Sequence, residues 1–97
     1  MRRAQAGGGF AALVRRGDPD AGAILVVLRE RGRLHAFLER VLGAEGYVWR
    51  ATPLDPGNEA GASSLLSDRA RFDPDLWVIE LDIAQAERFA AEWTATR

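Results

Sequence analysis

RFDPDLWVIELD, residues 71–82, decides the fold of this chain. A charged approach and an Asp-Pro-Asp turn lead directly into a strand. Successive side chains of a strand point to opposite faces, and here both faces are apolar. One face carries Leu76, Val78 and the Cβ of Glu80, and the other carries Trp77, Ile79 and Leu81. A strand of this kind is expected to be covered on two sides.

Four more strands are expected before this one, each bounded by turn-forming residues. They lie at residues 10–15, 23–28, 33–40 and 47–52. Residues 17–22 are dense in turn formers and separate the first two strands. The short charged segment at residues 29–32 ends in Gly and suits a hairpin into the third strand. We therefore expect the first three strands to form a meander.

A helix is expected in the middle of the chain. Asn58 or Ser63 can cap it, and it runs to about Arg71 before Pro74 ends it. Its expected apolar contacts are Ala62, Leu65, Leu66 and Phe72.

A second helix is expected after the last strand. Asp82 and Gln85 fit a capping box, in which the two side chains would satisfy backbone groups at the helix start. One face of this helix would carry Ala86, Phe89, Ala90 and Trp93. Residues 2–6 are consistent with the end of a further helix, stopped by three glycines. The expected fold class is α+β, with an antiparallel or mixed sheet of about five strands and two helices packed on it.

Length and composition bound the class of protein. The 97 residues allow a single domain, at a size where association with a copy or a partner supplements stability. The net charge of −1 provides no overall field toward nucleic acid or an anionic membrane. The chain has no cysteine, which excludes disulfides and thiolate chemistry, and no run approaches the ~20 apolar residues of a membrane span. With no apolar signal segment at the N-terminus, a cytoplasmic protein without a cofactor is expected.

Three blocks of sequence carry a family resemblance. They are GGFAALVRRGDPDAGAILVVLRERGRL at residues 8–34, YVWRA at residues 47–51 and RARFDPDLWVIELD at residues 69–82. Over roughly residues 2–82 the chain resembles a family of small alphaproteobacterial proteins, domain of unknown function 1491. The resemblance implies no established activity. Members of that family usually begin with a further amphipathic helix ahead of the equivalent of Arg2 and end soon after the last strand. By that resemblance this chain is expected to be short at its N-terminus, and residues 83–97 are expected to form a different helix.

Clustered acidic residues are the candidates for chemistry. Two Asp-Pro-Asp turns contain Asp73 with Asp75 and Asp18 with Asp20. Carboxylates at such spacing can hold Mg²⁺ or Mn²⁺, which would indicate a metal-dependent hydrolase or nuclease. The alternative is structural, because Asp-Pro-Asp supplies turn hydrogen bonds and a fixed φ. Carboxylates bonded to their own turn amides would favour this alternative.

Aromatic rings and arginines are the candidates for partner binding. Trp49 and Trp93 are large rings for a small domain, and an exposed ring beside an arginine is typical of an interface hot spot. Arg29 and Arg31 flank the expected hairpin, where they could hold an acidic partner. Acidic residues alternate with the arginines, so nucleic-acid binding is not expected. The sequence favours a non-catalytic protein-interaction module that binds a second copy or another protein.

Overall fold

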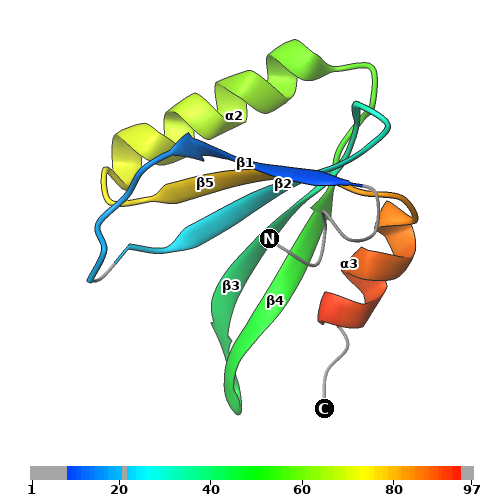
Figure 1. The fold of residues 1–97 in the computed structure, drawn as a ribbon. Coiled ribbons are helices and arrows are strands. Elements are labelled where there is room, and N and C mark those ends of the chain that lie inside the picture. The colour runs from blue at the N-terminus through cyan, green and yellow to red at the C-terminus, as the bar shows by residue number, and fades with distance from the viewer. Residues whose placement is uncertain (1–8, 21, 95–97) are drawn as a thin grey trace.

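The structure, a computed structural model, describes residues 9–20 and 22–94. The helix end expected at residues 2–6 lies outside the described residues. Each element of the described chain overlaps a segment that the sequence predicts (Figure 1). The strands are β1 (Phe10–Arg15), β2 (Ile24–Glu30), β3 (Arg33–Gly43), β4 (Gly46–Pro53) and β5 (Trp77–Asp82), and the helices are α2 (Glu59–Phe72) and α3 (Ala86–Thr94).

The strands form one five-stranded sheet in the order β1-β5-β2-β3-β4. β2 and β5 pair in parallel, and every other neighbouring pair is antiparallel. The sheet is therefore mixed, and with its two helices it confirms the α+β class.

The strand order corrects one expectation. β1, β2 and β3 do not form a meander, because β5 lies between β1 and β2. The meander is instead β2–β3–β4. Burial agrees with this order: β2, β3 and β5 carry buried residues and lie inside the sheet, whereas β1 and β4 carry none and form its edges.

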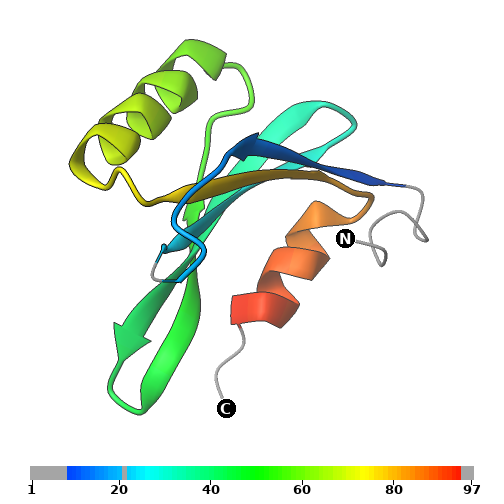
Figure 2. The ribbon, with the colours of Figure 1, turned by 60° about the vertical axis from the view of Figure 1, so that its left-hand side comes forward.

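The two helices lie on opposite sides of the sheet (Figure 2). An apolar cluster lies between the sheet and each helix. The cluster on the α2 side contains Leu25, Val27, Leu34, Phe37, Ala62, Leu76 and Val78, with Leu54 and Leu66 packed against it. The cluster on the α3 side contains Val26, Leu28, Leu38, Leu81, Ile83, Ala86 and Ala90, with Ala11, Trp49, Ala51, Phe89 and Trp93 packed against it. Val78 and Leu81 fall in different clusters, as the alternation along β5 predicts.

α2 begins and ends where the sequence indicates. Asn58 is the N-cap, and its Oδ1 accepts a hydrogen bond from the backbone N of Gly61 at 3.0 Å. The helix ends at Phe72, two residues before Pro74. No helix among the described residues is long and apolar enough to cross a membrane.

Only part of the expected apolar face of α2 meets the sheet. Ala62 is buried, and Leu66 packs against the same cluster, because residues four apart share one stripe of a helix. Leu65 is half-exposed and Phe72 is exposed, so the expectation that they contact the core is wrong. Both lie on the flank of the stripe that faces the sheet.

α3 does not use the expected capping box. The Asp82 carboxylate instead accepts hydrogen bonds from the backbone N of Arg31 at 2.9 Å and of Gly32 at 2.8 Å. The backbone N of Ala86, at the helix start, donates to Oε1 of Glu30 at 2.9 Å, and this bond lowers the pKa of Glu30. A carboxylate from the end of β2 therefore takes the place of a local cap.

Candidate functional site

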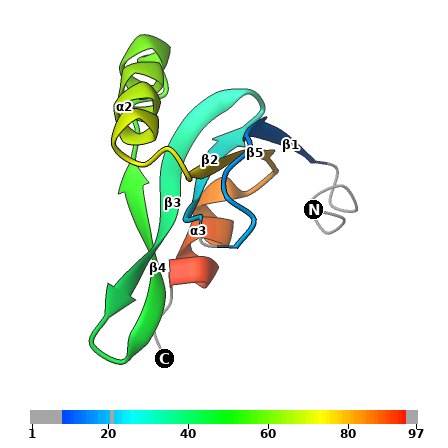
Figure 3. The same cartoon turned by 90° about the vertical axis from the view of Figure 1, so that its left-hand side faces the viewer.

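The β3–β4 hairpin reaches past the end of α3 (Figure 3). Apolar side chains near its tip are exposed. Leu42 and Tyr47 lie opposite each other across the two strands and are 73% and 65% exposed. The guanidinium of Arg40 lies 4.9 Å from the centroid of the Tyr47 ring, which is a cation–π contact. We call these three residues the hairpin surface.

An open hollow of about 390 Å³ adjoins the hairpin surface. It is lined by Asp20, Gly22, Ala23, Ile24, Arg40 and Tyr47. Ile24, the first residue of β2, is 36% exposed, so the apolar surface continues from the hairpin toward the middle of the sheet. One acidic and one basic side chain border the hollow, which leaves its walls without a net charge.

The two tryptophans predicted to bind a partner pack on each other. The ring centroids of Trp49 and Trp93 are 4.7 Å apart, and those of Phe89 and Trp93 are also 4.7 Å apart. Both tryptophans are half-buried and belong to the packing between α3 and β4. An exposed ring beside an arginine does occur at two other places, at Tyr47 beside Arg40 and at Phe72 beside Arg71. In the sequence, the exposed ring of Tyr47 could have been found from its position, directly after the turn glycine Gly46.

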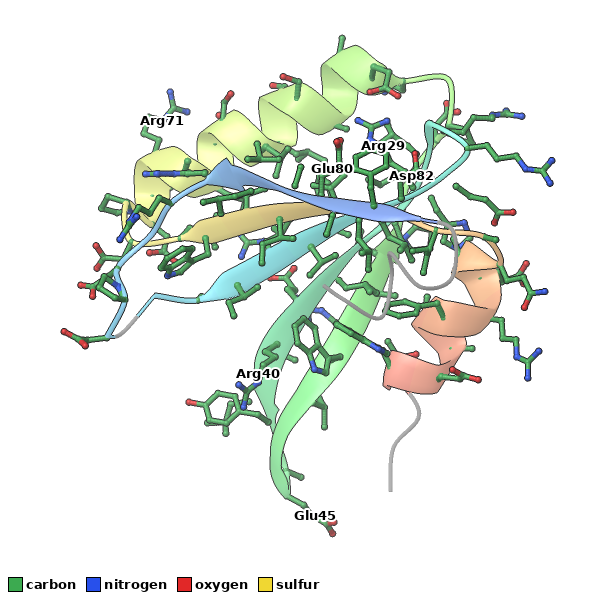
Figure 4. All side chains as sticks on the ribbon, in the orientation of Figure 1. Arg29, Arg40, Glu45, Arg71, Glu80 and Asp82 are labelled. Atoms are coloured by element: carbon green, nitrogen blue, oxygen red, sulfur yellow. The ribbon has the colours of Figure 1, made fainter. Side chains whose placement is uncertain are left out.

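Arg29 holds three elements together (Figure 4). Its Nε donates to Oε2 of Glu80 in β5 at 2.6 Å, and its Nη1 donates to Oε2 of Glu59 in α2 at 2.8 Å. Nη1 also donates to the carbonyl oxygen of Gly32 at 3.0 Å, and Nη2 donates to Oε1 of Glu59 at 3.0 Å. We call Arg29, Glu59 and Glu80 the Arg29 clamp. These bonds occupy Arg29 inside the chain, whereas Arg31, whose side chain is exposed, stays a predicted partner residue.

The Arg29 clamp makes the stability of the fold depend on pH. Hydrogen bonds from Arg29 lower the pKa of Glu59, and the same bonds raise the pKa of Arg29. A carboxylate whose pKa is lower in the folded chain stabilises the fold above its ordinary pKa of 4.5. This contribution is lost as the pH falls through the folded value. Acid is therefore expected to weaken the attachment of α2 at its N-terminal end.

A second ion pair attaches α2 nearer its C-terminal end. Nη2 of Arg69 lies 2.8 Å from Oε2 of Glu39 in β3, and Nη1 donates to the other carboxylate oxygen at 3.2 Å. These bonds raise the pKa of Arg69. Arg50 in β4 stands 3.9 Å from the same carboxylate, so its own ion pair is the longer one.

The two Asp-Pro-Asp turns lie next to each other, but their carboxylates do not converge on a common point. The backbone N of Asp18 donates to the carbonyl oxygen of Asp75 at 3.0 Å. Oδ1 of Asp18 accepts from the backbone N of Asp20 at 2.8 Å, and Oδ1 of Asp73 accepts from the backbone N of Asp75 at 3.3 Å. This is the geometry that favours the structural interpretation. In the part of the chain that the structure describes, no three ligand-type side chains are grouped to hold a metal ion.

Two glycines explain why the turns can approach so closely. A Cβ at Gly17 would lie 2.2 Å from the carbonyl oxygen of Asp75, and a Cβ at Gly22 would lie 2.3 Å from the same atom. Only glycine therefore fits at these positions. Nε1 of Trp77 also donates to the carbonyl oxygen of Asp18 at 2.8 Å, which fixes the first turn to the start of β5.

Fold and site together define a small α+β domain with one mixed sheet, a helix on each face, carboxylates engaged in turns and anchors, and an exposed apolar hairpin. The chain belongs to the DUF1491 family, described as proteins of unknown function, whose model matches residues 1–91. That match extends beyond residue 82, so the expectation that α3 departs from the family pattern is corrected over most of its length.

Solved structures of relatives agree with this fold. A crystal structure of a DUF1491 family protein from Caulobacter crescentus is 33% identical, with a TM-score of 0.71, and the match covers 84% of this chain and 78% of that one. An NMR structure of a DUF1491 family protein from the same organism gives 30% identity, a TM-score of 0.73 and coverages of 89% and 79%. Protein Atu0922 from A. tumefaciens is 31% identical, with a TM-score of 0.68 and coverages of 88% and 79%. No curated protein matches the chain.

Proposed function

We propose that this protein is a cytoplasmic, non-catalytic protein-interaction module that contacts its partner through the hairpin surface. The observation that carries the proposal is the opposed pair of Leu42 and Tyr47, which are 73% and 65% exposed. Contiguous exposed apolar surface is typical of interaction sites on soluble proteins. Arg40 against the Tyr47 ring adds the residue types that most often anchor protein interfaces.

Many charged side chains are already hydrogen-bonded within the chain. This favours protein binding over a metal-dependent hydrolase or nuclease and over nucleic-acid binding. A metal-dependent hydrolase or nuclease needs carboxylates that are free to converge on an ion, and Asp18 and Asp73 hold turn amides instead. Nucleic-acid binding needs arginines available on one continuous face, and Arg29 and Arg69 are bonded to carboxylates. The apolar hairpin surface is better matched to another protein.

A photoreactive phenylalanine analogue placed at Tyr47 tests the proposal. The variant is expressed in Caulobacter crescentus, which has a DUF1491 protein of its own, and the cells are irradiated. We expect covalent protein adducts, because a partner seated on the hairpin surface brings its atoms within reach of this ring. Their masses are read by immunoblotting and mass spectrometry.

The matched control carries the same analogue at Phe72, which is 82% exposed on α2. Adducts at residue 47 in clear excess over residue 72 support the proposal, whether the partner is the same chain or a different protein. Equal adducts at both positions, or none at residue 47, would contradict it.

A further inference from the structure

The two helices are attached to the sheet in different ways. α2 has 14 residues and is tied to the sheet by the ion pairs of Glu59 and Arg69, which lie near its two ends. α3 has nine residues, and in the described part of the chain its one ion pair, Arg88 with Glu92, lies within the helix. Helices shorter than about 12 residues are marginal on their own. The position of α3 therefore depends on its packing and on how it begins.

α3 begins at an unfavourable backbone conformation. Gln85, the residue before the helix, has a φ of 58°, in the left-handed region that residues with a side chain rarely adopt. Its carbonyl oxygen accepts a hydrogen bond from the backbone N of Phe89 at 3.0 Å, so it belongs to the first turn. The backbone N of Ala86 donates to Glu30 of β2 at 2.9 Å. A carboxylate from another element therefore holds the start of α3.

The packing and the last turn of α3 add modest stabilisation. Its buried residues are Ala86 and Ala90, whereas the larger Phe89 and Trp93 are only half-buried. Small side chains remove little apolar area from water. Within Ala86–Thr94 the last turn carries no basic residue to offset the negative end of the helix dipole. The contacts that keep α3 on the sheet are therefore few.

A hinge lies between the sheet and α3. Ile83 is buried, and its backbone N donates to the carbonyl oxygen of Arg29 at 3.0 Å. The next two residues, Ala84 and Gln85, are exposed. Rotation at these two residues would leave Ile83 in the α3-side cluster and would release Gln85 from its left-handed conformation.

We propose that α3 is a hinged cover, which opens about Ala84 and Gln85 while the sheet and α2 stay folded. Segments with few buried apolar contacts open at a lower free energy than the whole domain unfolds. Opening moves Trp93 away from Trp49, which lies opposite Arg40 of the hairpin surface. The apolar surface beside the hairpin is thereby enlarged, and the use of this larger surface for binding rests on the proposed function.

Two single-cysteine variants test the local opening. The chain has no cysteine, so Ala90→Cys places its one thiol beneath α3, and Ala62→Cys places its one thiol beneath α2. Both alanines are 7% exposed, which makes Ala62→Cys the matched control. Alkylation by iodoacetamide, followed by mass spectrometry, measures how often each thiol becomes accessible. We expect the Ala90→Cys variant to react at least about tenfold faster, because local opening needs less free energy than global unfolding.

Two further substitutions should change the opening of α3 in opposite directions. Glu30→Ala removes the carboxylate that caps Ala86 and should speed the alkylation of Ala90→Cys about fivefold, the effect expected for the loss of a helix cap. Gln85→Gly adopts the left-handed conformation without strain and should slow the same alkylation. Neither substitution should change the alkylation of Ala62→Cys.

Hydrogen exchange of the native chain checks the same opening without any substitution, because the amides of α3 should exchange faster than those of β2. Equal alkylation of the two thiols would overturn the inference, since α3 would then open only when the whole domain unfolds. The inference also fails when Glu30→Ala leaves the Ala90→Cys rate unchanged or speeds both thiols equally.

The failure of this inference differs from the failure of the proposed function. Alkylation and hydrogen exchange are measured on the chain alone, whereas the proposed function is tested by adducts at residue 47. A chain whose α3 does not open but which forms those adducts overturns the hinged cover and keeps the interaction module. A chain whose α3 opens but which forms no adducts keeps the hinged cover and contradicts the interaction module.

Discussion

Leu38→Ala is expected to lower the free energy of unfolding by about 2–5 kcal/mol, the cost typical of removing a fully buried leucine side chain. Leu38 is 0% exposed and sits in the α3-side cluster in the middle of β3. The substitution removes apolar contacts with both the sheet and α3 and leaves a cavity. Small domains have only about 5–15 kcal/mol of stability in total, so this change should remove a large share of it. Urea denaturation followed by tryptophan fluorescence measures it.

The matched control is Leu42→Ala, on the same strand and the same face. Leu42 is 73% exposed, so its truncation is expected to change stability by less than about 0.5 kcal/mol. Similar losses for the two variants would mean that α3 does not cover β3 as described.

Arg29→Met is expected to cost about 2 kcal/mol, between the values for exposed and buried ion pairs. The methionine keeps most of the apolar stem, but Glu80 loses a partner at 2.6 Å and Glu59 loses both of its hydrogen bonds. The ion pair with Glu80 is partly buried, at 18% and 27% exposure of the two side chains, whereas Glu59 is 55% exposed and its pair with Arg29 is closer to a surface pair. Denaturation at neutral pH measures the loss.

Arg31→Met is the control for Arg29→Met, because the side chain of Arg31 is exposed and is expected to contribute little. The pH dependence is a second readout. In the native chain, stability should fall as the pH drops below 4.5, because Arg29 lowers the pKa of Glu59 in the folded state. Arg29→Met should flatten this fall. An unchanged acid profile together with native stability would show that the Arg29 clamp does not anchor α2.

The two faces of β5 could be predicted because side-chain direction along a strand is a local property. Val78 and Leu81 alternate in sequence, and they lie in the α2-side and α3-side clusters. The strand order could not be predicted in the same way. β1 pairs with β5 although most of the chain separates them, and nothing within residues 10–15 selects β5 over β2 as a neighbour.

The contacts of the candidate site could not be predicted from the sequence either, because they depend on how separate elements pack. Arg29 and Arg31 look equivalent in sequence, but Arg29 meets Glu80 and Glu59 only because β5 and α2 come to lie beside β2. Tyr47 fits a half-buried strand by its alternation with Val48. Its exposure depends on the nine-residue α3 ending before the tip of the hairpin, and that is set by how two separate elements pack.

Light scattering after size-exclusion chromatography, over a wide range of protein concentration, tests the central claim most directly. The mass of the native chain is expected to rise with concentration toward that of two chains, because a second copy would cover the exposed Leu42 and Tyr47 of the hairpin surface. Tyr47→Asp should hold the mass at one chain throughout. A native chain that stays monomeric at every concentration would contradict self-association through the hairpin surface.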